Sequence, residues 1–380
     1  MSYALKWFAP NGFNAIHLFQ FRDQAMRAQL MLLFTVALLS ARVVIAHEPF
    51  DEANTIRKIE LLGGKVTRDD TLPGRPVVGV SVINTEFADS DMELLSNFKN
   101  LKYVTANNTK VTDAGLMILK GIPTLTTLYL GDTQVTDSGL NHLKGLTNLT
   151  TLVVFGTKIS DAGLEHVKGL TKLECLNLSD TQVTDSGLGH LKDLTSLKQL
   201  YLHCPRISDV GLEHLTRMSN LSRLVLSETQ LSNAGLERLK GLIKLDELCI
   251  NQTQVTDVGL EHLKNLPSLR FLNLNQTQIT DKGLEHIERL SSVETLWLDE
   301  SQVTDTGMEY LGRMRNLERL SLCKTQVTDV GLEHLKGLTK LGYLDLGGSQ
   351  TTYEGRENLR KALPSWKSPD NNGLWLRTTR

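Results

Sequence analysis

The segment Leu149–Lys172 reads LTTLVVFGTKISDAGLEHVKGLTK, and near copies of it fill most of the chain. Glycine recurs every 24 residues at the position of Gly163, and an acid or its amide stands two residues before almost every one of these glycines. Repetition at a fixed interval of roughly 20–50 residues is typical of proteins built from stacked structural units. The period therefore decides the fold.

The repeat runs without insertion or deletion. Its glycines are Gly115, Gly139, Gly163, Gly187, Gly211, Gly235, Gly259, Gly283, Gly307, Gly331 and Gly355. The preceding acids or amides are Asp113, Asp137, Asp161, Asp185, Asp209, Asn233, Asp257, Asp281, Asp305 and Asp329, and Tyr353 stands in the last place. A degenerate copy with Asp91 in place of glycine comes first, so residues 77–364 are predicted to form twelve units of 24 residues.

One unit shows how the repeat is expected to fold. Leu152 alternates with polar or variable neighbours, as in a short strand with one buried face. The pair Ser160-Asp161 carries side-chain oxygens suited to a helix N-terminus. Leu164 and Val167 then form the inward stripe of a short helix, which Gly169 is expected to end in a left-handed conformation. Each unit is predicted to be a strand, a turn, a short helix and a second turn.

A single unit cannot bury both its strand face and its helix face, so the units must stack. Neighbouring helices need about 8–10 Å of lateral room, whereas neighbouring strands need only about 4.8 Å. The stack must therefore curve toward its strands. The sequence predicts an α/β solenoid with a parallel sheet on the concave face and short helices on the convex face.

The consensus Leu-x-x-Leu-x-Leu-x-x-Thr-x-Val-Thr-Asp-x-Gly-Leu-x-His-Leu-Lys-Gly-Leu resembles the leucine-rich repeat superfamily. It is most similar to the Thr-Asp-x-Gly-Leu subtype of exported bacterial proteins, which is itself similar to the cysteine-containing repeats of ubiquitin-ligase adaptors. The resemblance covers about three quarters of the chain. It implies a right-handed horseshoe and says little about the ligand.

Charge and cysteine content narrow the function classes. The chain has 41 Lys+Arg against 43 Asp+Glu, a formal net charge of −2, so the basic excess typical of nucleic-acid binders is missing. Four cysteines are too few for a disulfide scaffold. Cys175 and Cys249 lie three units apart, about 15 Å at the usual strand spacing, so no intramolecular disulfide is expected. All four cysteines, Cys204 and Cys323 included, are expected on the sheet side.

The two ends differ from the repeats. Leu30–Ala41 is a 12-residue apolar run with Arg27 before it and Val44–Ala46 after it, the pattern of a secretory signal. We expect residues 1–46 to hold a signal peptide or an uncleaved signal anchor, with translation starting at Met1 or Met26; a buried helix of a cap domain is the alternative. Residues 47–76 are predicted to be an N-terminal cap and 365–380 a C-terminal cap or tail, in which Trp366 folds back over the last layer.

Two further columns of repeated residues invite functional readings. Seven of the ten histidines share one position: His142, His166, His190, His214, His262, His286 and His334. Neighbouring helices are about 8–10 Å apart, too far for one metal ion to join these imidazoles at about 2 Å, so a repeated surface residue is the preferred interpretation. Threonine follows each strand, and its hydroxyl is expected to bond to a neighbouring loop. Pro205 replaces it once, where a local distortion is expected.

Enzyme motifs are missing or incomplete. The run Gly63–Val66 suggests a phosphate loop, but Ile59 stands where its first glycine belongs and Val66 where Ser or Thr belongs. There is no His-Glu-x-x-His sequence and no Gly-x-Ser-x-Gly elbow. Acids and histidines that could act in catalysis recur with the period, which indicates a scaffold role. We expect neither catalysis nor a cofactor nor a metal.

The outward strand residues vary while the frame does not. Aromatic and charged residues are frequent among them, and such residues carry much of the binding energy in protein interfaces. Tyr129, Tyr201 and Trp297 are expected to point fully outward. The predicted binding residues on the concave face are Tyr103, Tyr129, Phe155, Tyr201, His203, Arg223, Glu247, Phe271, Trp297, Asp299, Arg319 and Tyr343.

These patterns predict an exported, non-catalytic scaffold that binds a protein partner on its concave sheet. Two alternatives stay open. The repeat subtype suggests a substrate-recognition subunit of a ubiquitin-ligase type, although residues 47–76 are too short for a docking domain. The outward aromatics and the pairs Asn251-Gln252 and Asn275-Gln276 suggest a carbohydrate or cell-wall binder. Nucleic acid is not expected as a partner, and contact with a membrane is expected only through an uncleaved N-terminal segment.

Overall fold

The computed structural model describes residues 51–363, 365 and 366. Nearly all of them belong to the second of two compact units, Ala53–Arg380. The predicted export signal within residues 1–46 and most of the predicted tail at 365–380 lie outside the described residues. Across the part of the chain that is described, no helix combines the length and the apolar character needed to cross a bilayer.

A single 13-stranded sheet runs through the unit with its strands in sequence order. Twelve of them pair in parallel, and the first pairs antiparallel with the second. The strands are β1 Lys65–Arg68, β2 Val77–Ser81, β3 Tyr103–Thr105, β4 Thr127–Tyr129, β5 Thr151–Val153, β6 Cys175–Asn177, β7 Gln199–Tyr201, β8 Arg223–Val225, β9 Glu247–Cys249, β10 Phe271–Asn273, β11 Thr295–Trp297, β12 Arg319–Ser321 and β13 Tyr343–Asp345.

Short helices follow the strands. The α-helices are α2 Glu52–Leu61, α3 Asp113–Leu116, α4 Asp137–Leu140, α5 Asp161–Leu164, α6 Asp185–Leu188, α7 Asn233–Arg238, α8 Asp257–Leu260, α9 Asp281–Ile287, α10 Asp305–Leu311, α11 Asp329–Leu335 and α12 Tyr353–Ala362. The 3₁₀ helices are η2 Asp89–Asn97, η3 Met117–Gly121, η4 Asn141–Leu143, η5 Gly189–Leu191, η6 Gly211–Leu215, η7 Leu239–Gly241 and η8 Glu261–Asn265.

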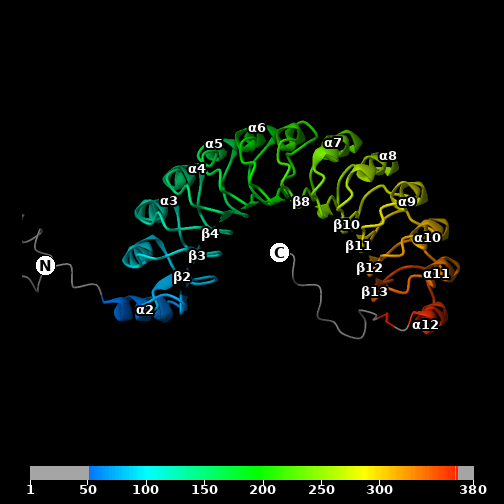
Figure 1. Ribbon diagram of the computed structural model, residues 1–380, viewed down its shortest axis with the longest axis horizontal. Helices are drawn as coiled ribbons and strands as arrows, with labels where there is room; N and C mark the ends of the chain where they lie inside the picture. The colour runs from blue at the N-terminus through cyan, green and yellow to red at the C-terminus, as the bar shows by residue number, and fades with distance from the viewer. Residues whose placement is uncertain (1–50, 364, 367–380) are drawn as a thin grey trace, which may run out of the picture. The chain divides into compact units, whose positions relative to one another are not determined.

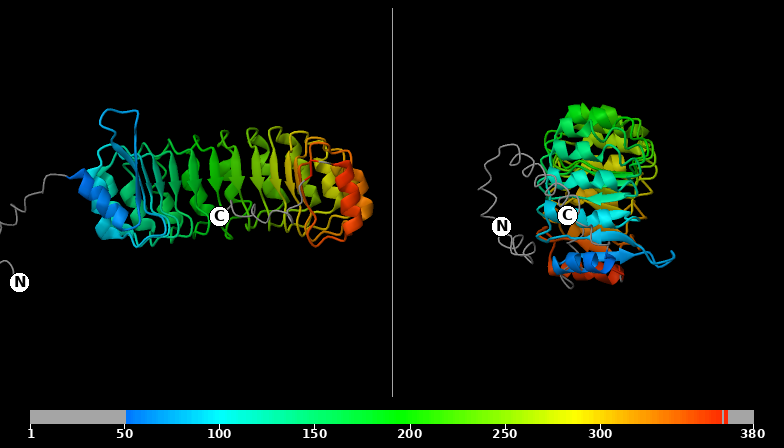
Figure 2. Two further views of the ribbon diagram at one scale, coloured as in Figure 1. Left: turned by 90° about the horizontal axis from the view of Figure 1, so that it is seen from below. Right: turned by 90° about the vertical axis from the view of Figure 1, so that its left-hand side faces the viewer.

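The repeat unit curves as an arch, with the strands on the inner side and the helices on the outer side (Figure 1). Seen from below the arch, the strands lie side by side along its length (Figure 2). Each strand residue lies opposite the residue 24 positions later, as Leu128 does with Leu152 and Leu152 with Leu176. These middle residues are fully buried, and one apolar core runs through all the repeats. The predicted curved α/β solenoid is confirmed.

The conserved spacing of acid and glycine joins neighbouring repeats. Asp161 Oδ1 accepts a hydrogen bond from the Thr184 N–H at 2.7 Å, and its Oδ2 accepts one from the Thr184 hydroxyl at 2.6 Å. The same carboxylate lies against Gly187, where a Cβ would come within about 3.1 Å of the Asp161 Cα. Acid and glycine are therefore required together because each acid packs on the glycine of the next repeat.

Two expectations about the unit were wrong in detail. Ser160 is the N-cap of α5, but its hydroxyl bonds to Asp137 of the preceding repeat and not to its own helix. Gly169 is not among the residues with positive φ, so no left-handed conformation ends the helix there. The threonine column also differs from the prediction: the Thr157 hydroxyl donates to the Val154 carbonyl of its own repeat at 2.6 Å.

We expect Asp161→Ala to destabilise the repeat unit by about 2 kcal/mol, because two hydrogen bonds to a carboxylate are lost and the Thr184 N–H is left without its acceptor. Asp161→Asn should cost clearly less. Asn233 already occupies this column, where its Oδ1 accepts from the Thr256 N–H at 2.9 Å and its Nδ2 donates to the Thr256 hydroxyl at 2.8 Å. Urea unfolding followed by circular dichroism measures both; equal losses would contradict the bridging role.

One turn departs from the pattern, as Pro205 predicts. At the equivalent turn position Asp180 and Glu228 have φ of 56° and 57°, whereas Cys204 is not among the residues with positive φ. The Asp180 N–H donates to the His203 carbonyl of the next repeat at 2.8 Å, but the Cys204 N–H donates to Leu202 of its own repeat. The Cys204 thiol is buried in the core, so the expectation that it lies on the sheet side was wrong.

This turn also makes fewer bonds to its neighbours. Gln182 and Gln230 each donate a backbone N–H to the preceding repeat at 2.8 Å, while the corresponding Arg206 N–H has no backbone acceptor within the described residues. We expect the amides of 203–208 to exchange with deuterium at least about tenfold faster than those of the matched windows 179–184 and 227–232, because unbonded backbone opens locally. Equal protection in a mass-spectrometric exchange experiment would show that the broken ladder has no dynamic consequence.

Both ends of the stack carry covering elements. Helix α2 buries Ile59 against the first layer, and Gly63 follows the helix with a φ of 85°. Trp366 is buried, and its indole N–H donates to the Leu344 carbonyl at 3.0 Å. The last layer is therefore closed by a residue that follows the final helix, as expected for Trp366.

Candidate binding surface

The inner face of the sheet presents three parallel columns of side chains. They begin at Tyr103, Thr105 and Asn107 and repeat every 24 residues along the register of the strands. All twelve residues predicted for binding fall on these columns or directly beside them at the strand ends. The structure therefore gathers on one face residues that lie up to 240 positions apart, from Tyr103 to Tyr343.

The predicted exposure of these residues needs correction. Tyr129, Tyr201 and Trp297 project from the inner face, but each is half-buried by its neighbours and none is fully outward. Among the twelve predicted binding residues only Arg319 is exposed. A half-buried aromatic ring is held in place, so it loses less conformational freedom when a partner covers it.

Two of the aromatic rings lie over glycines. A Cβ on Gly79 would overlap the ring of Tyr103, and a Cβ on Gly131 would overlap the ring of Phe155. In each pair the glycine precedes the aromatic residue by 24 positions. The sequence thus contained a signal for these two seats, a glycine beside an aromatic residue in one column, which residue-type reasoning alone had missed.

The centre of the face is occupied by an internal polar network. Arg223 Nη2 donates to Glu247 Oε1 at 2.5 Å, and its Nη1 donates to the Tyr201 hydroxyl oxygen at 3.0 Å. The hydrogen bond to Glu247 raises the pKa of the Arg223 guanidinium further above its ordinary value. These two charges neutralise each other, so the middle of the face offers a tyrosine ring beside a closed ion pair.

The C-terminal half of the face holds the tightest aromatic pair. The rings of Phe271 and Trp297 meet edge to face, with centroids 4.9 Å apart and planes at 74°. Beside them Asn275 Nδ2 donates to Asp299 Oδ2 at 3.0 Å. Asp299 Oδ1 also accepts from the Ser321 hydroxyl at 2.5 Å and from the Cys323 N–H at 2.8 Å. The Asp299 carboxylate is thus satisfied within the sheet.

Several groups near this pair stay uncharged at neutral pH. Burial, with Asp345 nearby, raises the pKa of Tyr343 to about 12. Burial also raises the pKa of the Cys323 thiol to about 12 and that of the Cys249 thiol to about 12. High thiol pKa values disfavour the nucleophilic thiolate, so these cysteines behave as small apolar residues of the surface.

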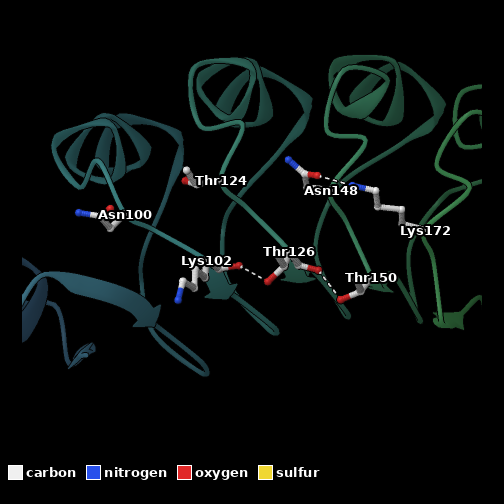
Figure 3. A pocket seen from close by; sticks show the side chains of 7 residues that line it. All are labelled: Asn100, Lys102, Thr124, Thr126, Asn148, Thr150 and Lys172. Carbon is white, nitrogen blue, oxygen red and sulfur yellow. Dashed lines mark hydrogen bonds between the residues drawn. The ribbon is translucent and has the colours of Figure 1, made fainter. Parts of the chain in front are cut away.

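An open depression of about 400 Å³ lies on the flank of the sheet, beside the starts of β3 to β5 (Figure 3). It is lined by Asn100, Lys102, Thr124, Thr126, Asn148, Thr150 and Lys172. Its threonine hydroxyls already donate to backbone carbonyls, and Lys172 Nζ donates to Asn148 Oδ1 at 2.8 Å. Its polar groups are engaged with one another, so the concave face is the stronger candidate site.

The histidine column lies on the convex helices. No group of three or more His, Cys, Asp or Glu side chains is placed to hold a metal ion anywhere in residues 51–363. Nδ1 of His166 is buried without a hydrogen-bond partner. Burial, and secondarily Lys144, lowers the pKa of His166, while Glu165 and Asp137 oppose this and Lys168 adds to it.

A lowered pKa in the native state means that the unfolded chain binds a proton first as the pH falls. The stability contributed by neutral His166 is complete above the ordinary histidine pKa of about 6.5 and is lost as the pH falls below it. We expect a small loss of stability between about pH 6.5 and 5, and a smaller one in His166→Gln. Urea midpoints measured across this range test it; parallel curves for the two proteins would contradict it.

Family models for leucine-rich repeats match residues 121–142, 145–166 and 265–287 as single repeats and 171–216 as a pair of repeats. The sequence matches none of the curated proteins. Among solved structures, an internalin (inlF) from Listeria monocytogenes aligns over 77 % of this chain and 86 % of its own, at 24 % identity and a TM-score of 0.58.

Two further structures share the fold at lower identity. The functional domain of InlJ from Listeria monocytogenes, which includes a cysteine ladder, is 18 % identical over 72 % of this chain, with a TM-score of 0.52. The Arabidopsis receptor kinase HAESA, solved with the peptide hormone IDA and the co-receptor SERK1, is 17 % identical over 79 % of this chain, with a TM-score of 0.53. This chain spans 54 % of each of those two chains. With its 24-residue repeats and its curved sheet, the chain belongs to the leucine-rich repeat superfamily.

Proposed function

We propose that the protein is a non-catalytic scaffold that binds a protein partner on its concave sheet. The observation that carries the proposal is the row of half-buried, preset aromatic rings on that face, above all the edge-to-face pair Phe271–Trp297. Tyrosine, tryptophan and arginine dominate the energetically important positions of protein interfaces. Solenoid repeat proteins use their extended concave surfaces for binding.

The comparisons support a binding role in general terms. Leucine-rich repeat proteins are typically interaction scaffolds, and the HAESA structure contains a bound peptide hormone and a co-receptor. No residue cluster in the described part of the chain has the arrangement of a metal site, and the conserved acids are engaged in bonds between repeats. A role as a ligand-binding surface therefore accounts for more of the molecule than catalysis does.

We further propose that the protein is exported by the apolar segment Leu30–Ala41 and acts outside the cytoplasm, and that residues 47–76 cap the first repeat. The test is to follow a fusion of residues 1–76 to a reporter that is active only after export. An exported reporter supports this localisation, and a reporter retained in the cytoplasm overturns it without bearing on the concave face.

Affinity capture from an envelope extract of the source organism tests the proposed function. The bait is residues 47–380, run beside the same bait carrying Tyr129→Ala, Tyr201→Ala and Trp297→Ala. We expect one or more proteins to be retained by the first bait and lost from the second. If both baits retain the same proteins, the concave face is not the binding surface; binding to a glycan array would instead favour the carbohydrate alternative.

A further inference from the structure

Most charges on the concave face are neutralised by the protein itself. Arg223 is paired with Glu247. His203 Nε2 lies 3.1 Å from Glu228 Oε2. Asp299 accepts three hydrogen bonds from its neighbours. Asp345 accepts from the Gly347 N–H at 3.0 Å and from the Tyr343 hydroxyl at 3.4 Å.

Arg319 differs from all of these. It is the first residue of β12 and is exposed. Among the described residues, no ion pair or side-chain hydrogen bond engages its guanidinium. An unpaired guanidinium keeps five N–H donors, and its planar fork matches the two oxygens of a carboxylate. The concave face therefore offers one free cation whose geometry suits an acidic group.

The surroundings of Arg319 provide an apolar contact beside the charge. Along its column Arg319 lies opposite Thr295, which in turn lies opposite Phe271. On the next column Trp297 lies opposite Ser321. The small residues Thr295 and Ser321 thus separate Arg319 from the Phe271–Trp297 pair, which leaves a low area between a cation and two aromatic rings.

From this arrangement we infer that the partner presents an acidic residue next to an apolar or aromatic one, the acid pairing with Arg319 and the apolar residue packing on Trp297. The inference rests on the proposed function and specifies its partner. A carboxylate is favoured over a basic group because the nearby carboxylates of Asp299 and Asp345 are already engaged, whereas the guanidinium of Arg319 is not. Tyr343, opposite Arg319 on β13, stays neutral and does not compete for the cation.

The experiment uses the repeat protein, residues 47–380, to select binders from a displayed library of random 12-residue peptides. We expect selected peptides to be enriched in Asp and Glu beside an aromatic or branched apolar residue. Arg319→Glu should weaken their binding at least about tenfold, and Arg319→Lys should weaken it less, since the charge remains but the bidentate geometry is lost. Arg217→Glu, an exposed arginine outside the concave columns, is the matched control and should bind like the wild type.

Salt dependence gives a second readout. Raising NaCl from about 50 to 300 mM should weaken peptide binding to the wild type more than to Arg319→Ala, because screening acts on the exposed ion pair. Peptides without acidic enrichment that are lost on Tyr129→Ala/Tyr201→Ala but kept on Arg319→Glu would overturn this inference and leave the proposed function standing. A library without any binder would contradict the inference alone. Binding that survives every concave substitution would overturn both.

Discussion

Gly187→Val is expected to destabilise the repeat unit by about 3 kcal/mol or more. A Cβ at this position would lie 3.0 Å from the Asp161 Cγ and 3.1 Å from the Asp161 Cα, and closer still to the carboxylate oxygen. The clash therefore involves backbone of the preceding repeat, which cannot move aside as the tip of a flexible side chain can. It also displaces the carboxylate from Thr184, so two hydrogen bonds between the repeats are lost with it.

Gly169→Ala is the matched control for this prediction. Gly169 also recurs with the period, but no atom lies within 4 Å of the Cβ that alanine would add, and its φ is not positive. Alanine should leave the stability unchanged or raise it by up to about 1 kcal/mol, because it restricts the unfolded chain. Urea unfolding of both variants decides between the two roles of glycine; comparable losses would mean that the contact with Asp161 is not what the column protects.

Trp297→Ala is expected to weaken binding of the captured partner by at least about 2 kcal/mol, roughly thirtyfold in Kd. Removing the indole deletes the largest ring of the concave face and leaves Phe271 without its edge-to-face neighbour. The fold should persist, since the core beneath is filled by Leu296 and Leu298, both fully buried. Isothermal titration calorimetry measures the affinity, and a thermal melt checks the fold.

The control for Trp297 is Tyr353→Ala. Tyr353 is 81 % exposed at the start of α12, away from the concave columns. Its removal deletes an aromatic ring of similar kind, so a partner that uses the inner face should bind this variant as tightly as the wild type. If Tyr353→Ala weakens binding as much as Trp297→Ala does, the partner covers the end of the stack and the assignment to the concave face is wrong.

The repeat pattern was sufficient to predict which residues face inward and which face the partner. Leu152 and Leu176 are buried, and Tyr201 and Trp297 lie on the inner face, as their places in the period indicate. The period could not show how far each ring projects, because the exposure of Trp297 depends on the size of Phe271 across the strand boundary. Nor could it show which charges are already paired, since Arg223 and Arg319 occupy the same column and only the first has a carboxylate beside it.

By itself the sequence determined the class of fold, the stacking direction and the face that varies, because a 24-residue unit with one apolar strand face and one apolar helix face can bury both only by stacking. The tertiary structure alone decided why the acid and the glycine are inseparable. Asp161 meets Thr184 and Gly187 of the next repeat, and a periodic sequence looks the same whatever the lateral offset between units. That offset follows from how helices and strands of different width pack side by side, which three-dimensional coordinates show and a period does not.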